Sequence, residues 1–229
     1  SIDRSVAAAR ERGCDVVELS ADRPFTAARG RNAGFRHVRQ VYRVELVQFL
    51  DGDTEVYPGW LSCATNAILQ DDAIAAVTGR RRERAPTASV FNQLCDIEWR
   101  RPAGDADTIG GDVLLRATAI ERAGLYDETL IAGEDPELSQ RIRALGLRIV
   151  SLAVDMTLHD AAMTKVAQWW QRAKRSGHAY AEVRARRAHA PGRFWQREVR
   201  SNWLWGAALP IGAGALGLAT LGLGFAALP

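Results

Sequence analysis

Two acidic residues, Asp51 and Asp53, flank a single glycine directly after an apolar run at residues 44–50. The run predicts a buried strand, and in open parallel sheets ligands bind outside the carboxyl ends of the strands. Two close carboxylates suit Mg²⁺ or Mn²⁺, which take oxygen ligands and bridge carboxylates to phosphate oxygens. A simple Asp-Gly turn explains the same tripeptide without a ligand. Because short motifs often match by chance, the tripeptide alone favours the turn.

A second acidic pair, Glu134 and Asp135, stands directly before Pro136. Asp135 can cap a helix whose first residue is the proline, which explains both residues without catalysis. An aspartate at a helix N-terminus also stays ionised, as a general base must be. Capping leaves the second acid unexplained, and from this segment alone the two interpretations are equally supported.

Further polar residues could contact phosphates or a metal. Arg29 and Asn32 could reach a nucleotide, because arginine offers paired donors to phosphate oxygens, although a solvated basic face explains them slightly better. His159 could complete a metal site or hold a diphosphate, although a lone histidine at a strand end is more often structural. Arg172 and Arg175 suit a leaving diphosphate or anionic lipid headgroups, and lipid is favoured.

The elements that must position these residues alternate along the chain. Strands are predicted at residues 14–19, 44–50, 74–78, 108–116 and 147–154. Helices are predicted at residues 3–12, 27–39, 58–70, 118–123 and 136–145. This alternation indicates an α/β fold with a mainly parallel sheet. Since the chain opens with a helix, we expect an N-terminal strand of the sheet to be missing from this sequence.

The C-terminal part has a different composition. Residues 163–188 predict a long basic helix with interleaved aromatic residues, as in helices that lie at a membrane interface. Residues 203–228 are uncharged and apolar or small, and exceed the ~20 residues needed to cross a bilayer core. A buried glycine-rich hairpin is the less favoured alternative. We therefore expect a catalytic domain, an interfacial helical region and a transmembrane helix, at residues 1–160, 161–200 and 201–229.

Bulk properties exclude some classes of protein. The net charge of +3 over 229 residues is too small, and too evenly mixed along residues 1–160, to indicate a nucleic-acid partner. The three cysteines, Cys14, Cys63 and Cys95, form no CxxC pair. Neither a disulfide framework nor a zinc site is therefore predicted, and a reducing compartment is the simpler expectation.

Taken in order, these segments resemble the family 2 glycosyltransferases, which have the GT-A fold. The resemblance covers nearly all of residues 1–191. It is carried by the sequence Ala-Arg-Gly-Arg-Asn-Ala-Gly at residues 28–34, Asp51-Gly52-Asp53, Gly110-Gly111, the sequence at residues 123–128, and Gly133-Glu134-Asp135 with the helix that follows. Each motif is weak alone, whereas the ordered set is specific.

On the donor side, the resemblance implies that Asp53 is the principal metal ligand and that Asp51 contacts the ribose or nucleotide of the donor. It implies nucleotide contacts for Arg29 and Asn32. His159 matches a position that helps to bind metal or phosphate in some members. The implied cofactor is Mg²⁺ or Mn²⁺, and the implied donor is a nucleotide-diphosphate sugar.

On the acceptor side, the resemblance implies that Gly110, Gly111 and Glu134 line the pocket for the sugar and the acceptor. Asp135 would take the proton from the acceptor hydroxyl, with inversion at the anomeric carbon. The strand and acidic turn that normally open the family and hold the nucleotide base are not in this sequence. Residues 171–175 are similar to the Gln-Arg-x-x-Arg-Trp motif of processive synthases.

In that motif, Ser176 stands in place of the tryptophan, which argues for transfer of a single sugar. We therefore expect a metal-dependent, inverting, hexosyltransferase-like enzyme on the cytoplasmic side of the inner membrane. Its partners would be a saccharide or lipid-linked acceptor and membrane lipid, with no nucleic acid. A processive polysaccharide synthase is one alternative. The other is a membrane-anchored module that binds nucleotide sugar without catalysis, against which the intact acidic residues argue.

Overall fold

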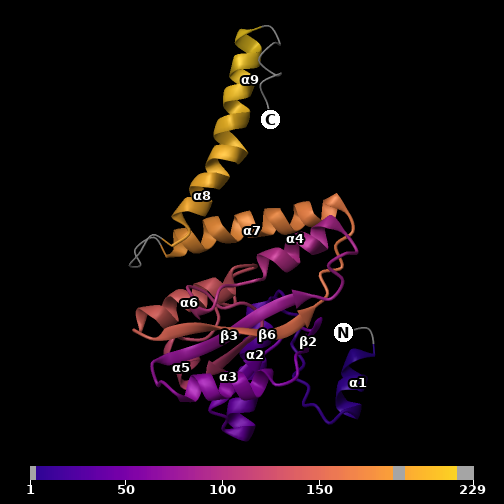
Figure 1. Ribbon diagram of the computed structural model, residues 1–229, viewed down its shortest axis with the longest axis vertical. Coiled ribbons are helices and arrows are strands. Elements are labelled where there is room, and N and C mark those ends of the chain that lie inside the picture. Colours follow the sequence, from indigo (N-terminus) through magenta and orange to yellow (C-terminus); the bar gives the residue numbers. More distant parts are fainter. Residues whose placement is uncertain (1–3, 188–193, 221–229) are drawn as a thin grey trace. The chain divides into compact units, whose positions relative to one another are not determined.

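The computed structural model describes residues 4–187 and 194–220. The chain divides into two compact units, one ending at Thr164 and one beginning at Lys165. The first unit contains the sheet, and the second is helical in its described part (Figure 1). The further division of residues 161–229 into interfacial and membrane regions stays a prediction.

The described strands form one sheet in the order β1-β5-β3-β6-β2, and β4 pairs with β6. Their bounds are β1 (Leu46–Phe49), β2 (Thr54–Val56), β3 (Ile74–Glu83), β4 (Gly104–Asp105), β5 (Val113–Arg116) and β6 (Arg148–His159). The β3–β6 pair is parallel, whereas the other pairings are antiparallel. The expectation of a mainly parallel sheet is therefore wrong. The reason is that β5 inserts between β1 and β3 in the opposite direction to both.

The helices of the first unit are α1 (Ser5–Glu11), α2 (Ala27–Tyr42), α3 (Trp60–Leu69), α4 (Val90–Glu98), α5 (Ala117–Arg122) and α6 (Glu134–Ala144). The side chain of Thr26 caps α2 by accepting a hydrogen bond from the backbone nitrogen of Arg29 at 3.1 Å. At α6 the cap is Gly133, with φ of 87°. Because α6 begins at Glu134, Asp135 lies inside the first turn, so its interpretation as the helix cap is wrong.

Side chains alternate between the two faces of the sheet, as the strand period requires. On one face, Val113 and Leu115 of β5 pack in the same cluster as Phe35 of α2. On the other face, Leu114 packs in the cluster that contains Trp60 of α3. Helices therefore cover both faces, and Figure 1 shows α3 and α6 on opposite sides of the sheet.

One predicted strand is not formed. Residues 14–19 belong to no helix or strand and pair with no strand in the described part of the chain, and Val17 is 39% exposed. An extended segment needs a neighbouring strand to satisfy its backbone groups in a sheet, so the prediction of a strand here is wrong. Sequence analysis also missed α4, β2 and β4. The cap of α4 is Ser89, whose side chain accepts a hydrogen bond from the backbone nitrogen of Asn92 at 3.0 Å.

The second unit contains α7 (Val166–Arg186), α8 (Gln196–Trp203), a π-helical turn (Leu204–Ala208) and α9 (Leu209–Ala219). Among residues 4–187 and 194–220, no helix combines the length and the apolar character that crossing a membrane requires. The predicted transmembrane helix is therefore not supported, and its last residues, 221–229, lie outside the described part.

Candidate active site

Asp51, two residues after the end of β1, has both carboxylate oxygens in contact with arginines. Its Oδ1 accepts a hydrogen bond from Nη2 of Arg31 at 2.7 Å, and its Oδ2 accepts one from Nη2 of Arg81 at 3.3 Å. The backbone nitrogen of Asp51 donates to Oδ1 of Asp112 at 2.9 Å. The carboxylate of Asp51 is thus held between two guanidinium groups.

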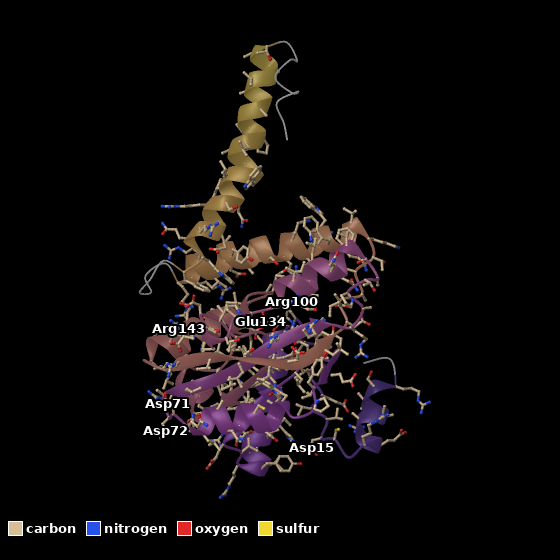
Figure 2. All side chains as sticks on the ribbon, viewed as in Figure 1. Asp15, Asp71, Asp72, Arg100, Glu134 and Arg143 are labelled. Carbon is tan, nitrogen blue, oxygen red and sulfur yellow. The ribbon has the colours of Figure 1, made fainter. Side chains whose placement is uncertain are left out.

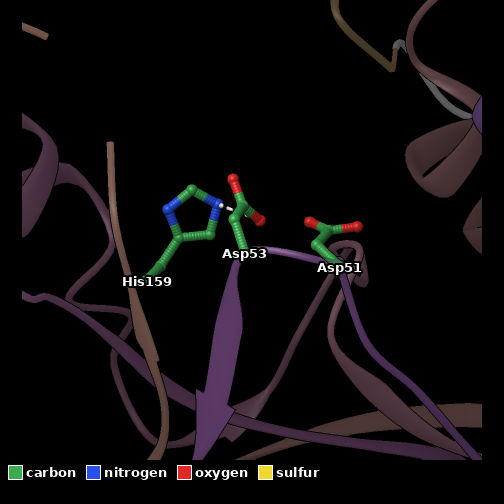
Figure 3. Close-up of side chains that lie close together, drawn as sticks. All are labelled: Asp51, Asp53 and His159. Carbon is green, nitrogen blue, oxygen red and sulfur yellow. Dashed lines mark ion pairs between the residues drawn. The ribbon is translucent and has the colours of Figure 1, made fainter. Parts of the chain in front are cut away.

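Asp53 and His159 meet because β2 pairs with the end of β6, where Thr54 lies opposite His159. Nε2 of His159 lies 3.3 Å from Oδ1 of Asp53. One ligand atom from each of Asp51, Asp53 and His159 lies within 4.8 Å of the others, and Figure 3 shows Asp53 between the other two side chains. The two carboxylates supply oxygen ligands of the kind that Mn²⁺ and Mg²⁺ prefer, and the imidazole adds one nitrogen ligand.

Asp112 is a fully buried acid that sequence analysis missed. Its Oδ2 accepts a hydrogen bond from the hydroxyl of Thr157 at 2.7 Å and lies 3.0 Å from Nη2 of Arg81. Since its Oδ1 binds the backbone of Asp51, Asp112 ties the turn after β1 to β6. The available signal was an acidic residue at the entrance to an apolar strand.

The two glycines predicted to line the acceptor pocket lie beside these side chains. A β-carbon on Gly111 would stand 2.4 and 2.5 Å from the carboxylate oxygens of Asp51. On Gly110 it would meet nothing closer than Nη2 of Arg81 at 4.0 Å. Gly111 therefore allows Asp51 to lie against the backbone, while the acceptor contacts of both glycines stay a prediction.

Arg31 connects Asp51 to the second acidic pair. Its Nη1 lies 2.7 Å from Oε1 of Glu134 and 3.3 Å from Oδ1 of Asp135. Glu134 is labelled among the side chains in Figure 2. Arg31, Asp51, Glu134 and Asp135 are called the Arg31 cluster below. Acidic residues from distant parts of the sequence therefore come together around one guanidinium.

The environment of Asp135 favours its neutral form. Burial raises the pKa of its carboxyl to about 7, the charge of Arg31 opposes this rise, and the charges of Glu134 and Asp51 add to it. Its buried Oδ1 has no hydrogen-bond partner among the described residues, although Arg31 lies at ion-pair distance. A carboxyl with a pKa near 7 is suited to accept a proton at neutral pH.

Arg29 and Asn32 hold loops of the protein. The guanidinium of buried Arg29 donates to the backbone oxygens of Ser20 and Arg23, both at 2.8 Å. Nδ2 of Asn32 donates to the backbone oxygen of Tyr126 at 2.9 Å, and its Oδ1 accepts from the backbone nitrogen of Tyr126 at 3.0 Å. The predicted nucleotide contacts of both residues stay predictions.

Trp99 is another residue that sequence analysis missed. The guanidinium of Arg81 lies over its ring, 5.6 Å from the centroid, and its ring meets that of His159 edge to face, with centroids 4.8 Å apart. Trp99 therefore lies between an arginine that contacts Asp51 and a candidate metal ligand. The aromatic residue at the end of a short apolar helix was the only sequence signal.

Arg172 and Arg175, predicted to hold the diphosphate, lie on α7 in the second unit. Their assignment to the diphosphate therefore stays a prediction.

Known sequences that resemble this chain include a family model and curated relatives. The model of the family described as Glycosyl transferase family 2 matches residues 1–109. The pre-mycofactocin glycosyltransferase of Mycobacterium tuberculosis is 24% identical over 166 residues, which cover 68% of this chain and 34% of that protein. The chain thus spans about a third of the length of this curated relative.

Solved structures share the fold. A mannosyltransferase from Pyrobaculum calidifontis, in complex with GDP-Man and Mn²⁺, matches with a TM-score of 0.64 and 22% identity over 96% of this chain and 64% of that chain. Glucosyl-3-phosphoglycerate synthase from Mycobacterium tuberculosis, in complex with Mn²⁺ and UDP-Glc, matches with a TM-score of 0.52 and 16% identity over 80% of this chain and 64% of that chain. The mixed α/β sheet is therefore GT-A-like. The chain is thus similar in sequence to glycosyl transferase family 2 over residues 1–109 and is GT-A-like in fold.

Proposed function

We propose that this glycosyltransferase moves a sugar from a nucleotide-diphosphate donor to an acceptor hydroxyl, with inversion, and that it uses Mn²⁺ or Mg²⁺. The observation that carries the proposal is the Arg31 cluster, which joins the metal-ligand group to a buried carboxyl that can accept a proton. Two structural neighbours are complexes with Mn²⁺ and a nucleotide sugar, which supports this choice of cofactor and donor.

On the donor side, Asp53 and His159 would hold the metal together with Asp51. When bound, the cation stabilises the negative charge that develops on the departing diphosphate. Arg81, which lies between Asp51 and Asp112, keeps the Asp51 carboxylate in place beside Gly111. The side chain of Asp53 is 56% exposed, so a donor diphosphate can approach it from solvent.

On the acceptor side, ionised Asp135 would take the proton of the acceptor hydroxyl. The oxygen of that hydroxyl attacks the anomeric carbon, and the bond from this carbon to the diphosphate oxygen breaks. The diphosphate leaves with the bonding electron pair. Attack opposite the leaving group inverts the anomeric configuration, and the burial of Asp135 makes it a stronger base than an exposed aspartate.

Attachment to the cytoplasmic face of the inner membrane is part of the proposal, with a saccharide or lipid-linked acceptor. It is supported by apolar side chains of the second unit, since Trp203 and Ile211 are each 70% exposed and Trp170 is 58% exposed. Exposed tryptophans beside basic residues are typical of helices at membrane interfaces. Flotation with anionic phospholipid vesicles would test it, and a protein that stays unbound would contradict it.

The catalytic proposal is tested with the full chain. GDP-mannose, UDP-glucose and UDP-N-acetylglucosamine are incubated with it, and release of the nucleoside diphosphate is measured with Mn²⁺ and with EDTA. We expect release from one of these donors, dependent on the metal and strongly reduced in Asp53→Ala. The control is Asp72→Ala, because Asp72 is fully exposed and lies outside the site. Release that persists in EDTA would contradict the metal-dependent mechanism.

A further inference from the structure

The two carboxylate oxygens of Asp51 contact two different arginines, and each arginine is held by other side chains. Arg81 is also held by Asp112, at 3.0 Å, and by the ring of Trp99. Arg31 instead reaches across to Glu134 and Asp135 with its other terminal nitrogen. A cation that uses Oδ1 of Asp51 must therefore share this atom with Arg31 or replace it.

If the contact between Arg31 and Asp51 is lost, other contacts still hold the Arg31 side chain in position. Its guanidinium lies over the ring of Tyr126, 5.5 Å from the centroid, and its Nη1 keeps Glu134 at 2.7 Å. Its side chain is only 12% exposed, so water does not replace a lost carboxylate freely. Oδ1 of Asp135 lies 3.3 Å from the same Nη1 and has no hydrogen-bond partner among the described residues, so Asp135 is the carboxylate that can become the new partner.

We propose that Arg31 is a positioning residue that exchanges Asp51 for Asp135 when a divalent cation binds at Asp51. The exchange orients the Asp135 carboxylate toward the acceptor only after the donor side is assembled. This inference rests on the proposed function, because it takes Asp51 as part of the metal site and Asp135 as the base. It assigns to Arg31 a role that its neighbours Arg29 and Asn32 do not have, since their side chains hold backbone groups.

Loss of the Arg31 charge should change cation affinity and turnover in opposite directions. The Arg31 cluster combines one guanidinium with the acids Asp51, Glu134 and Asp135. Removing the guanidinium frees an oxygen of Asp51 and removes a like charge near the cation, so the cation should bind more tightly. Asp135 then lacks the partner that orients it, so turnover should fall. A purely structural arginine would weaken both together.

The first measurement is the affinity for Mn²⁺ alone, by electron paramagnetic resonance titration of the full chain. In Arg31→Gln we expect Mn²⁺ to bind about tenfold more tightly, and in Arg31→Lys within about threefold of wild type, since a nearby charge repels the cation. The matched control is Arg36→Gln, which removes the same charge from α2 at a side chain that is 58% exposed. Its affinity should stay within about twofold, because solvent screens an exposed charge.

The second measurement is turnover of the donor that the wild-type protein uses. We expect kcat of Arg31→Gln to fall about 100-fold while Mn²⁺ binds more tightly, as loss of orientation alone can cost this much, and we expect Arg31→Lys to recover part of it. Thermal unfolding checks that each variant is folded.

Unchanged or weaker Mn²⁺ binding in Arg31→Gln overturns the exchange, and so does an unchanged kcat. A wild-type protein that binds no Mn²⁺ overturns the metal site of the proposed function and the exchange with it. If wild type binds Mn²⁺ and turns over donor while Arg31→Gln behaves identically, only the exchange is lost.

Discussion

The backbone of Gly111 lies against the carboxylate of Asp51. A β-carbon on residue 111 would stand 2.4 Å from Oδ2 of Asp51 and 2.7 Å from Nη2 of Arg31. Real β-carbons essentially never approach another atom this closely, so the side chains of Asp51 and Arg31 would have to move. The position of the Asp51 carboxylate, and with it one wall of the metal site, therefore depends on the absence of a side chain at residue 111.

Gly111→Ala should consequently weaken Mn²⁺ binding by about tenfold or more, because small displacements of a ligand cost affinity steeply. Gly110→Ala is the matched control, since its β-carbon would meet nothing closer than 4.0 Å. Its Mn²⁺ affinity should stay within about twofold of wild type. Equal affinities for the two variants, measured by the same titration, would show that Asp51 does not need Gly111.

Asp112→Asn should destabilise the fold. The fully buried carboxylate accepts hydrogen bonds from the backbone of Asp51 and from Thr157, and it pairs with Arg81. Loss of the charge leaves Arg81, whose side chain is 18% exposed, with a poorly compensated charge, which typically costs about 3 kcal/mol. Urea unfolding measures it, with exposed Asp72→Asn expected within about 0.5 kcal/mol of wild type. A similarly small effect at Asp112 would contradict this account of the turn.

The stability of the fold should depend on pH through Asp135. Its pKa is raised to about 7 in the folded protein, against about 3.9 when unfolded. Between these values the folded state binds more protons, so the contribution of this group is full below about pH 4 and is lost as the pH rises through 7. Asn does not titrate, so Asp135→Asn does not lose this contribution. As the pH rises from 4 to 8, its free energy of unfolding should therefore increase relative to that of wild type, by up to about 4 kcal/mol. Melting temperatures that differ equally at both pH values would contradict the raised pKa.

Catalytic efficiency should rise with pH, whereas the stability contribution of Asp135 falls. Only the ionised carboxylate of Asp135 can accept the acceptor proton, so kcat/KM should fall tenfold per pH unit below about 7. The acid limb of the pH profile, measured at saturating Mn²⁺, reports this group. If kcat/KM instead fell only near pH 4, the catalytic base would be an exposed carboxylate with an unshifted pKa, which would contradict the role of buried Asp135.

Much of the fold could be predicted from local patterns. The apolar run at residues 44–50 and the helical pattern at residues 27–39 correspond to β1 and α2. Strand direction could not be predicted, because the apolar run at residues 113–116 is the same whichever way β5 is inserted. Residues 14–19 have strand composition, but composition does not supply the neighbour that a strand requires.

The candidate site could likewise be predicted only where local sequence patterns reveal it. Asp51, Asp53 and Asp135 stood out as acids beside predicted strand and helix ends. Arg31 did not, because it differs from Arg29 only by its direction, and residues two apart on a helix point to different sides. Arg29 points toward the loop near Ser20, whereas Arg31 points toward the acids. Only the tertiary structure distinguishes them.

Asp135→Asn in the full-length protein tests the central claim most directly, with Mn²⁺ binding and nucleoside diphosphate release measured on the same sample. The substitution keeps the shape of the side chain but removes its ability to accept the proton. We predict that Mn²⁺ still binds and that turnover falls by at least about a thousandfold, as expected for loss of a general base. Release at the wild-type rate would contradict the assignment of Asp135 as the base.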